Sequence, residues 1–184
     1  MAGPQQQPSA EEIVLTAFNR MRDELLSTLT LHLGNREDAQ DVAQEAFLKC
    51  WRNRHEVHQV RNLRAWIYRI ALNTARDNRR SGWHKRRRAL DDASLDSSIC
   101  PHGQECEIEL REFYAHLRRA LLQLRPEERE VFLLRQNAEL SYEEIADIRN
   151  VPIGTVKTQM RSALAKLREV LRAHAPCAPD YEEP

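Results

Sequence analysis

The chain has 184 residues, and its 28 lysines and arginines balance 28 aspartates and glutamates. That length accommodates one domain of ordinary size or two small ones. The low glycine and aromatic content, with abundant leucine, alanine, arginine and glutamate, favours an all-α protein. No apolar run approaches the roughly 18 residues that a membrane span needs, and nothing resembles a signal peptide. The sequence therefore predicts a helical, cytoplasmic protein without membrane insertion.

The neutral total hides alternating blocks of charge. Residues 11–47 hold eight acids against three bases, and residues 89–114 hold seven acids against one base. Residues 61–88 hold ten bases, one acid and three aromatic rings, and residues 149–172 hold six bases against one acid. Cations interleaved with aromatic rings indicate a surface for nucleic acid.

Five segments follow one another along the chain. Residues 1–10, rich in glutamine, proline and alanine, are predicted to be disordered. Two small helical domains, residues 11–90 and 108–174, flank an acidic linker at residues 91–107, where Asp, Ser, Pro and Gly break all periodicity. Residues 175–184 are expected to form a loose tail. The expected architecture is two helical domains joined by a flexible linker.

The stretch "NREDAQDVAQEAFLKCWRNR" is predicted to be a helix with one apolar side. The residues expected on that side are Val42, Ala43, Ala46, Phe47 and Cys50. On the other side, Leu48 is bordered by Asp41, Gln44 and Glu45, a pattern that suits docking of a basic protein partner. A single exposed leucine is also normal on a solvated face, so both interpretations stay open.

Residues 63–80 form a second predicted helix, and its polar side is basic. The apolar side comprises Leu63, Trp66, Ile67, Ile70, Ala71 and Thr74. Opposite it, Arg69, Asn73, Arg76 and Arg80 make one stripe at helical spacing. Nucleic acid phosphates would relieve the repulsion between the arginines, and the amide of Asn73 can donate and accept toward a base edge. A solvated basic face or a membrane-surface helix is the alternative, although a lipid-binding helix needs its apolar side free.

Two further helices with a tight turn between them are predicted near the carboxyl terminus. Pro126 suits the first turn of the helix that precedes them. Ser141 and Glu144 then form a capping box, and "RNVP" leads into a basic helix over residues 153–172. This is the helix-turn-helix arrangement. The side chains at the exposed start of the last helix can reach base edges and phosphates in a major groove. They are Thr155, Lys157, Thr158, Arg161 and Ser162.

Together, residues 11–174 resemble a bacterial RNA polymerase sigma factor of the extracytoplasmic function (ECF) group, in the sigma-70 family. "DAQDVAQEAFLKCW" is similar to the part of region 2 that docks on the beta-prime clamp helices. "NLRAWIYRIALNTARDNRR" is similar to the part that melts and reads the minus-10 element. "LSYEEIADIRNVPIGTVKTQMRSALAKLRE" is similar to the region 4 motif that reads the minus-35 element. The order of the motifs, with a short linker and no region 3 domain, carries the resemblance.

The resemblance implies residue roles at three surfaces. Polymerase-facing positions are Asp41, Gln44, Glu45 and Leu48. At the minus-10 element, Asn73 matches the position that accepts an unstacked base, and Arg69 and Arg76 match its backbone-contacting neighbours. Groove-facing positions at the minus-35 element are Lys157, Thr158, Gln159 and Arg161. Family members often carry arginines where this chain has Gln159, Ser162 and Leu164, which leaves the minus-35 sequence open.

The resemblance also implies partners. They are core RNA polymerase, through its beta-prime clamp helices and beta flap, promoter DNA, and an anti-sigma factor. The free protein is expected to be a monomer whose two halves move independently until polymerase fixes their spacing. The alternative function is a stand-alone helix-turn-helix regulator that binds duplex DNA without polymerase. A pure protein-interaction module would not explain two basic faces.

The sequence offers no enzymatic motif and no expected cofactor. There is no phosphate-binding glycine loop, the spacing of "HEVH" does not suit a helical zinc pair, and no serine sits in a nucleophile elbow. The four cysteines are interpreted as free thiols, because a reducing compartment argues against disulfides. Cys100, His102 and Cys106 in "CPHGQEC" are the alternative candidates for a zinc or redox site, with a spacing unlike that of standard fingers.

Overall fold

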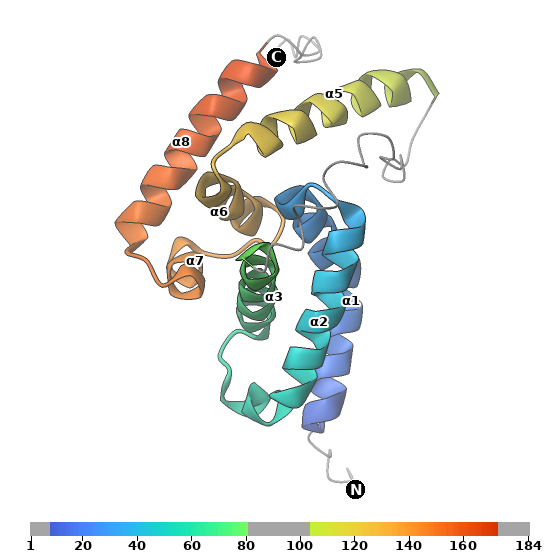
Figure 1. The fold of residues 1–184 in the computed structure, drawn as a ribbon, viewed down its shortest axis with the longest axis vertical. Coiled ribbons are helices and arrows are strands. Elements are labelled where there is room, and N and C mark those ends of the chain that lie inside the picture. The colour runs from blue at the N-terminus through green and yellow to red at the C-terminus, as the bar shows by residue number, and fades with distance from the viewer. Residues whose placement is uncertain (1–7, 81–103, 173–184) are drawn as a thin grey trace, which may run out of the picture.

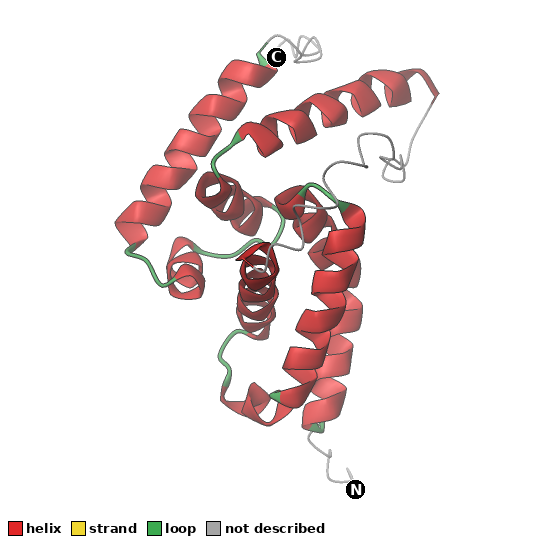
Figure 2. Cartoon of the chain, viewed as in Figure 1, coloured by secondary structure: helices red, strands yellow, loops and turns green. Residues whose placement is uncertain are grey.

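A computed structural model describes residues 8–80 and 104–172, and every regular element within these ranges is a helix (Figures 1 and 2). The amino-terminal half contains α1 (Ala10–Leu33), α2 (Arg36–Arg52), the short 3₁₀ helix η1 (Arg54–Gln59) and α3 (Leu63–Arg80). The carboxyl-terminal half contains α5 (Gln104–Gln123), α6 (Pro126–Gln136), α7 (Tyr142–Arg149) and α8 (Ile153–Leu171). The prediction of an all-α fold is confirmed.

Local signals fix the ends of the first two helices. Ser9 and Glu12 form a capping box at the start of α1, in which Ser9 Oγ accepts a hydrogen bond from the Glu12 amide at 3.2 Å. The helix ends at Gly34, whose φ of 82° suits glycine. A Cβ at Gly34 would also lie 3.1 Å from a methyl group of Leu122 in α5. The Asn35 side chain then caps α2 by accepting from the Glu37 amide at 2.7 Å.

The three long helices of the amino-terminal half pack around one apolar core. The apolar sides predicted for α2 and α3 are buried or half-buried, as expected. Fully buried residues from the three helices include Leu25, Leu29, Val42, Ala46, Cys50, Ile67, Ala71 and Leu72. Burial raises the pKa of the Cys50 thiol to about 12, so this cysteine stays protonated and acts as a small core residue.

Helices α7 and α8 form the predicted helix-turn-helix. Ser141 and Glu144 make the expected capping box, with the Ser141 amide donating to the Glu144 carboxylate at 2.8 Å. Helix α7 ends at Asn150, which adopts the left-handed conformation with a φ of 53°. Pro152 then lies just before the first turn of α8. Both helices rest on α6.

The two halves pack against each other in the structure. Helix α3 lies between the α1–α2 pair and α7, and α6 contacts α1 (Figure 1). Val131 and Leu134 of α6 and Leu140 of the following turn belong to the same buried cluster as the core of the amino-terminal half. The expectation that the halves of the free protein move independently therefore needs correction. Periodicity indicates an apolar side of α6 that includes Val131 and Leu134, but it does not indicate that this side is buried against the other half.

Candidate nucleic-acid and polymerase interface

The outer face of α2 presents an apolar residue among acids. The Leu48 side chain is 49% exposed, and Asp41 and Gln44 beside it are exposed. Glu45 lies on the edge of this face and forms an ion pair with Lys49, with 3.0 Å between the carboxylate and Nζ. All four predicted polymerase-facing residues thus lie on one accessible surface, where an exposed leucine can give affinity and the acids can select a basic partner.

The basic stripe of α3 is only partly free. Arg69 and Asn73 are exposed, whereas Arg76 is half-buried and donates from Nη1 to Asn73 Oδ1 at 2.8 Å. The side chain of Arg80 lies outside the described part of the chain. Arg76 Nη2 also contacts the carboxylate of Glu130 on α6. One predicted DNA-binding arginine is therefore occupied by an acid from the other half of the molecule.

Glu130 also contacts Arg149, which in turn binds a residue of the recognition helix α8. Its side chain is 6% exposed, and Arg149 Nε of α7 lies 3.3 Å from its Oε1. Arg149 in turn donates from Nη1 to the side chain of Gln159 on α8. Burial raises the pKa of Glu130, and the two guanidinium groups oppose that rise. We call these five residues (Asn73, Arg76, Glu130, Arg149 and Gln159) the interdomain network, because they link α3 to α8 without interruption.

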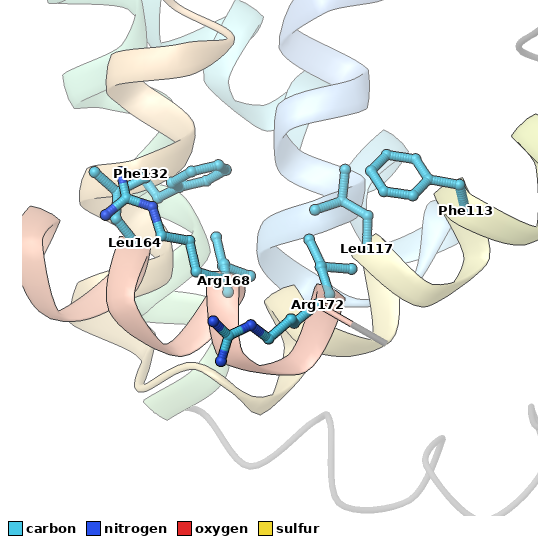
Figure 3. Close-up of a pocket in the computed structure, with 8 residues that line it drawn as sticks. Phe113, Leu117, Phe132, Leu164, Arg168 and Arg172 are labelled. Carbon is cyan, nitrogen blue, oxygen red and sulfur yellow. The ribbon is translucent and has the colours of Figure 1, made fainter. Parts of the chain in front are cut away.

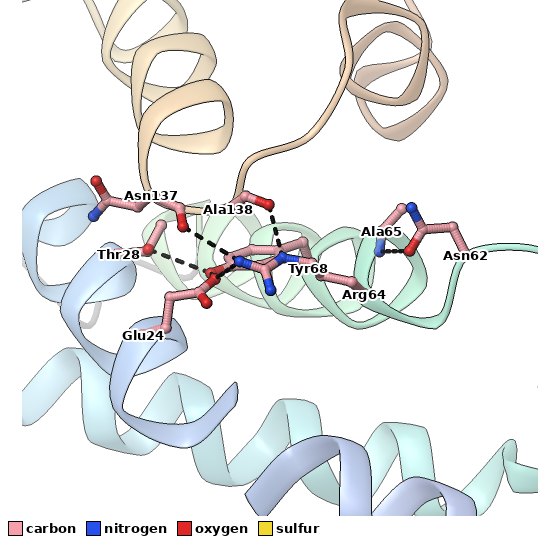
Figure 4. A network of polar contacts seen from close by, with 8 residues as sticks. All are labelled: Glu24, Thr28, Asn62, Arg64, Ala65, Tyr68, Asn137 and Ala138. Atoms are coloured by element: carbon pink, nitrogen blue, oxygen red, sulfur yellow. Dashed lines mark hydrogen bonds and ion pairs between the residues drawn. The ribbon is translucent and has the colours of Figure 1, made fainter. Parts of the chain in front are cut away.

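A second cluster joins the start of α3 to the turn after α6 (Figure 4). Arg64 Nε donates to the backbone oxygen of Ala138 at 2.7 Å, and its Nη2 lies 2.6 Å from the carboxylate of Glu24. The hydroxyl of the fully buried Tyr68 donates to the same carboxylate at 2.6 Å. Next to this cluster, the Asn62 amide donates to the Glu144 carboxylate of α7. Sequence analysis missed these contacts between the halves.

The recognition helix α8 presents three freely exposed polar side chains and three that are more enclosed. Lys157, Thr158 and Arg161 are exposed, and the Thr158 hydroxyl donates to the Gly154 backbone oxygen at 2.9 Å. Thr155 is half-buried, as is Gln159, which belongs to the interdomain network. The exposed residues lie near the start of the helix, where a major groove could receive them.

The third half-buried residue of this set, Ser162, is held by a buried carboxylate. Its hydroxyl donates to Glu128 Oε1 at 2.8 Å, and Lys166 Nζ contacts the other oxygen of Glu128 at 2.7 Å. Burial acts to raise the pKa of Glu128. The hydrogen bonds from Lys166, Ser162 and the Arg125 amide outweigh this effect, so the pKa is lowered. Ser162 thus serves the packing of α8 on α6.

An open apolar groove runs between α5, α6 and α8 (Figure 3). Its floor and walls comprise Phe113, Leu117, Phe132, Leu164, Leu167 and Leu171. Arg168 and Arg172 stand at its edge. The groove lies on the carboxyl-terminal half, away from the contacts with α3.

Sequence comparisons define the class of protein to which these surfaces belong. Residues 17–85 match the family "Sigma-70 region 2", and residues 115–167 match "Sigma-70, region 4". The matched ranges contain α2 and α3 on one side and α7 and most of α8 on the other. The protein therefore combines the polymerase-binding and DNA-reading regions of a sigma-70 factor, which favours this function over a stand-alone regulator.

Individual relatives place it in one group of that class. The chain is 32% identical over 168 residues to the ECF RNA polymerase sigma factor SigW of Bacillus subtilis, covering 82% of this chain and 84% of the relative. It is 34% identical over 143 residues to the ECF sigma factor EcfG of Rhodopseudomonas palustris, covering 75% and 74%. The chain belongs to the ECF group of RNA polymerase sigma factors. It binds core RNA polymerase and directs promoter-specific initiation, and it is not an enzyme.

Solved structures share the fold. The sigma factor RpoE of Bartonella quintana, in complex with the anti-sigma factor NepR, superposes with a TM-score of 0.64 at 22% identity, covering 85% of this chain and 95% of that one. CnrH in complex with the cytosolic domain of CnrY gives a TM-score of 0.61 at 25% identity, covering 89% and 90%.

The remaining predictions concern metals and membranes. Cys100 and His102 lie outside the described residues, as does the side chain of Cys106. Within the described ranges, no group of three or more histidines, cysteines or acids could hold a metal ion. None of the helices in those ranges is long and apolar enough to cross a membrane.

Proposed function

We propose that this sigma factor contacts core polymerase through the outer face of α2, the minus-10 element through α3 and the minus-35 element through α8. The observation that carries this proposal is the exposure of one residue set on each helix. They are Asp41, Gln44 and Leu48 on α2, Arg69 and Asn73 on α3, and Lys157, Thr158 and Arg161 on α8. Glu45, Arg76, Arg80, Thr155, Gln159 and Ser162 complete the proposed surfaces.

The exposed amide of Asn73 suits capture of a base that has left the stack, since it can donate and accept. Unstacking a base costs a few kcal/mol, and contacts to the separated strand offset that cost. Arg69, one turn earlier on the same face, would hold the neighbouring phosphate. Promoter opening then proceeds by trapping separated bases, without hydrolysis of a nucleotide.

Two further partners follow from the same proposal. The beta flap of the polymerase would contact region 4, where the apolar groove between α5 and α8 offers an open surface. An anti-sigma factor would sequester the free protein. The solved structures that share its fold contain RpoE in complex with the anti-sigma factor NepR and CnrH in complex with the cytosolic domain of CnrY. Both partners suit a protein that works in the cytoplasm, with the polymerase.

The polymerase contact is tested by Leu48→Asp. Loss of a central apolar anchor should weaken binding to core enzyme about tenfold or more, measured by fluorescence anisotropy of labelled sigma factor. Leu15→Asp is the matched control, because Leu15 is a 41% exposed leucine on α1, outside the proposed surface. Equal weakening by both changes would contradict the assignment.

The minus-10 contact is tested by Asn73→Ala in transcription reconstituted with core enzyme on genomic fragments. Open-complex formation, followed by permanganate reactivity of unpaired thymines, should fall on the order of tenfold, because stacking and capture of one base contribute about 1–3 kcal/mol. Binding to core enzyme should stay unchanged. Asn19→Ala, an exposed asparagine on α1, is the control. Equal losses of core binding and opening would refute the role of Asn73.

A further inference from the structure

Gln159, a residue of the proposed minus-35 surface, is bonded to an arginine that is almost buried. Arg149, the last residue of α7, donates from Nη1 to the side-chain oxygen of Gln159 on α8. The side chain of Arg149 is 7% exposed, and its Nε lies beside the carboxylate of Glu130 on α6. Three helices of the carboxyl-terminal half thus hold this guanidinium group in one place.

The chemistry of the contact decides which end of the Gln159 amide faces inward. A guanidinium group carries five N–H donors and no acceptor, so only the oxygen of an amide can bond to it. Because Arg149 is almost buried, the Oε1 atom of Gln159 is directed toward the protein. The amide nitrogen, Nε2, lies on the other branch of the same planar group and has no hydrogen-bonding partner within the described ranges. The half-buried Gln159 therefore offers DNA a group that only donates.

We expect the bond between Arg149 and Gln159 to persist when DNA is bound. Hydrogen bonds in which one partner is charged are roughly twice as strong as neutral ones. If Gln159 turned away, a nearly buried N–H group of Arg149 would lose its acceptor, which is costly where water has little access. Both residues belong to the carboxyl-terminal half, so the bond does not depend on how the two halves are packed.

A side chain that only donates distinguishes the bases in the major groove. A glutamine that presents both its oxygen and its nitrogen pairs with adenine, accepting from N6 and donating to N7. Guanine presents acceptors at both N7 and O6, whereas cytosine presents a donor at N4. With its oxygen bonded to Arg149, Gln159 is complementary to guanine and lacks the acceptor that the adenine pairing needs.

We propose that Arg149 is a positioning residue for minus-35 specificity: it holds the oxygen of Gln159 inward, so that Gln159 donates through Nε2 to guanine instead of pairing with adenine. The proposal rests on the groove-facing role proposed above for α8. It also gives a physical reason for a neutral acceptor at position 159, since an arginine there would place two guanidinium groups of like charge against each other.

The test is a selection of promoter DNA by holoenzyme reconstituted with core enzyme. The library is made from a genomic fragment that the wild-type holoenzyme transcribes, with the base pairs of its minus-35 element randomised. Gln159→Leu identifies the base pair that Gln159 reads, because the preference at that base pair should disappear in this variant. There the wild type should favour guanine over adenine about five- to tenfold, as expected for one good pairing with a base edge.

Arg149→Met tests the cause of that preference. Methionine fills space along the arginine stem but offers no donor, so the Gln159 oxygen becomes free to accept from adenine N6. The preference at the same base pair should therefore change from guanine to adenine, whereas a loss of stability alone would weaken binding to every sequence. Arg135→Met is the matched control, because Arg135 donates to the backbone oxygen of Leu140 in the same half, and it should keep the guanine preference.

Two outcomes would overturn the proposal at the base pair identified by Gln159→Leu. One is an adenine preference of the wild type, a comparison that decides the question even if circular dichroism shows that Arg149→Met does not fold. The other is a guanine preference that survives in a folded Arg149→Met, because the amide would then be oriented without Arg149.

A third outcome separates this proposal from the proposed function. If Gln159→Leu changes the preference at no base pair while Lys157→Ala still reduces the salt dependence of promoter binding, Gln159 does not read a base. The inference then fails, and the role of α8 at the minus-35 element stands. If neither variant has an effect, the proposed role of α8 fails together with the inference.

Discussion

The two helices proposed to read DNA, α3 and α8, differ in how far their polar side chains are bonded to other residues of the protein. On α3, Arg69 and Asn73 are exposed, and the contact that engages the stripe comes from the other half, through Glu130. On α8, Ser162 is held by Glu128 and Gln159 by Arg149, both within the carboxyl-terminal half. The proposed minus-10 surface is thus restrained by packing of the two halves, whereas part of the proposed minus-35 surface is restrained by contacts within the carboxyl-terminal half.

The difference arises from how each helix is supported. Helix α3 lies on an apolar core, and its Arg69 and Asn73 are exposed on the opposite side. Helix α8 rests on α6, which places the buried carboxylate of Glu128 beneath it. A buried carboxylate needs hydrogen-bonding partners, and α8 supplies Ser162 and Lys166. This explains why a serine, rather than an arginine directed at DNA, suits position 162 in this chain.

The largest effect is expected from a change in the core shared by both halves. Leu134→Ala removes a fully buried side chain of α6 and should lower the free energy of unfolding by about 2–5 kcal/mol. Because that side chain belongs to the shared core, we expect one cooperative transition in urea, shifted as a whole. Leu122→Ala, at an exposed leucine, should cost far less. Two separate unfolding transitions, of which only one is shifted, would show that the halves fold independently and that domain packing does not restrain α3.

A smaller effect is expected from Glu128→Gln, which weakens the support beneath α8. Loss of charged hydrogen bonds with Ser162 and Lys166 should destabilise the carboxyl-terminal half by about 1–3 kcal/mol, measured by urea denaturation. Glu127→Gln, at the exposed neighbouring position, should change stability by less than about 0.5 kcal/mol. Equal effects of the two changes would mean that α8 does not depend on this carboxylate.

The pH dependence of the stability difference between the wild type and Glu128→Gln tests whether the charged form of Glu128 supports α8. The pKa of Glu128 is lowered in the folded protein, so its contribution is present above the ordinary value of about 4.5 and is lost as the pH falls through the folded pKa. The stability gap between the wild type and Glu128→Gln should therefore be full at pH 6–7 and shrink below roughly pH 4. Denaturant titrations over that range measure it. A gap that widens in acid would contradict the role of the charged form.

The smallest effect is expected on promoter affinity, when an exposed residue of α8 is compared with one that is bonded within the protein. Lys157→Ala should weaken holoenzyme binding to a promoter fragment a few-fold and reduce the slope of log affinity against log salt by about 1, since one phosphate contact is lost. Gln159→Ala should leave that slope unchanged, because Gln159 is uncharged and bonded to Arg149. Filter binding at several salt concentrations distinguishes them. A constant slope for Lys157→Ala would remove this residue from the phosphate-contacting set.

The fold was predictable wherever short-range rules decide it. The predicted helix over residues 63–80 coincides with α3, because a continuous apolar side and a continuous polar side mark the same helix. The Ser141–Glu144 capping box fixed the start of α7, since both of its hydrogen bonds join residues three positions apart. The exposure of Leu48 also followed from helical periodicity. The roles of individual residues at DNA and polymerase remain predictions.

The packing of the halves was not predictable from the same rules. Asn62 and Glu144 are 82 positions apart, and Arg64 and Ala138 are 74 apart, so no local pattern connects them. Arg64 looked like one more cation of a basic stretch, although it binds Glu24 and a backbone oxygen. Glu130 lies on what periodicity suggests is a polar side of α6. Only the tertiary structure reveals that this side meets two arginines.

The acid at the centre of the interdomain network also bears on how the protein is distributed inside a cell. A chromosome offers on the order of a million or more non-specific sites, and a polycation left bare would be retained on them. The ion pair with Glu130 neutralises Arg76, one cation of α3, and so reduces that attraction. If Arg76 binds DNA as proposed, we expect copies with this ion pair intact to leave non-specific sites faster than copies in which Arg76 is bare.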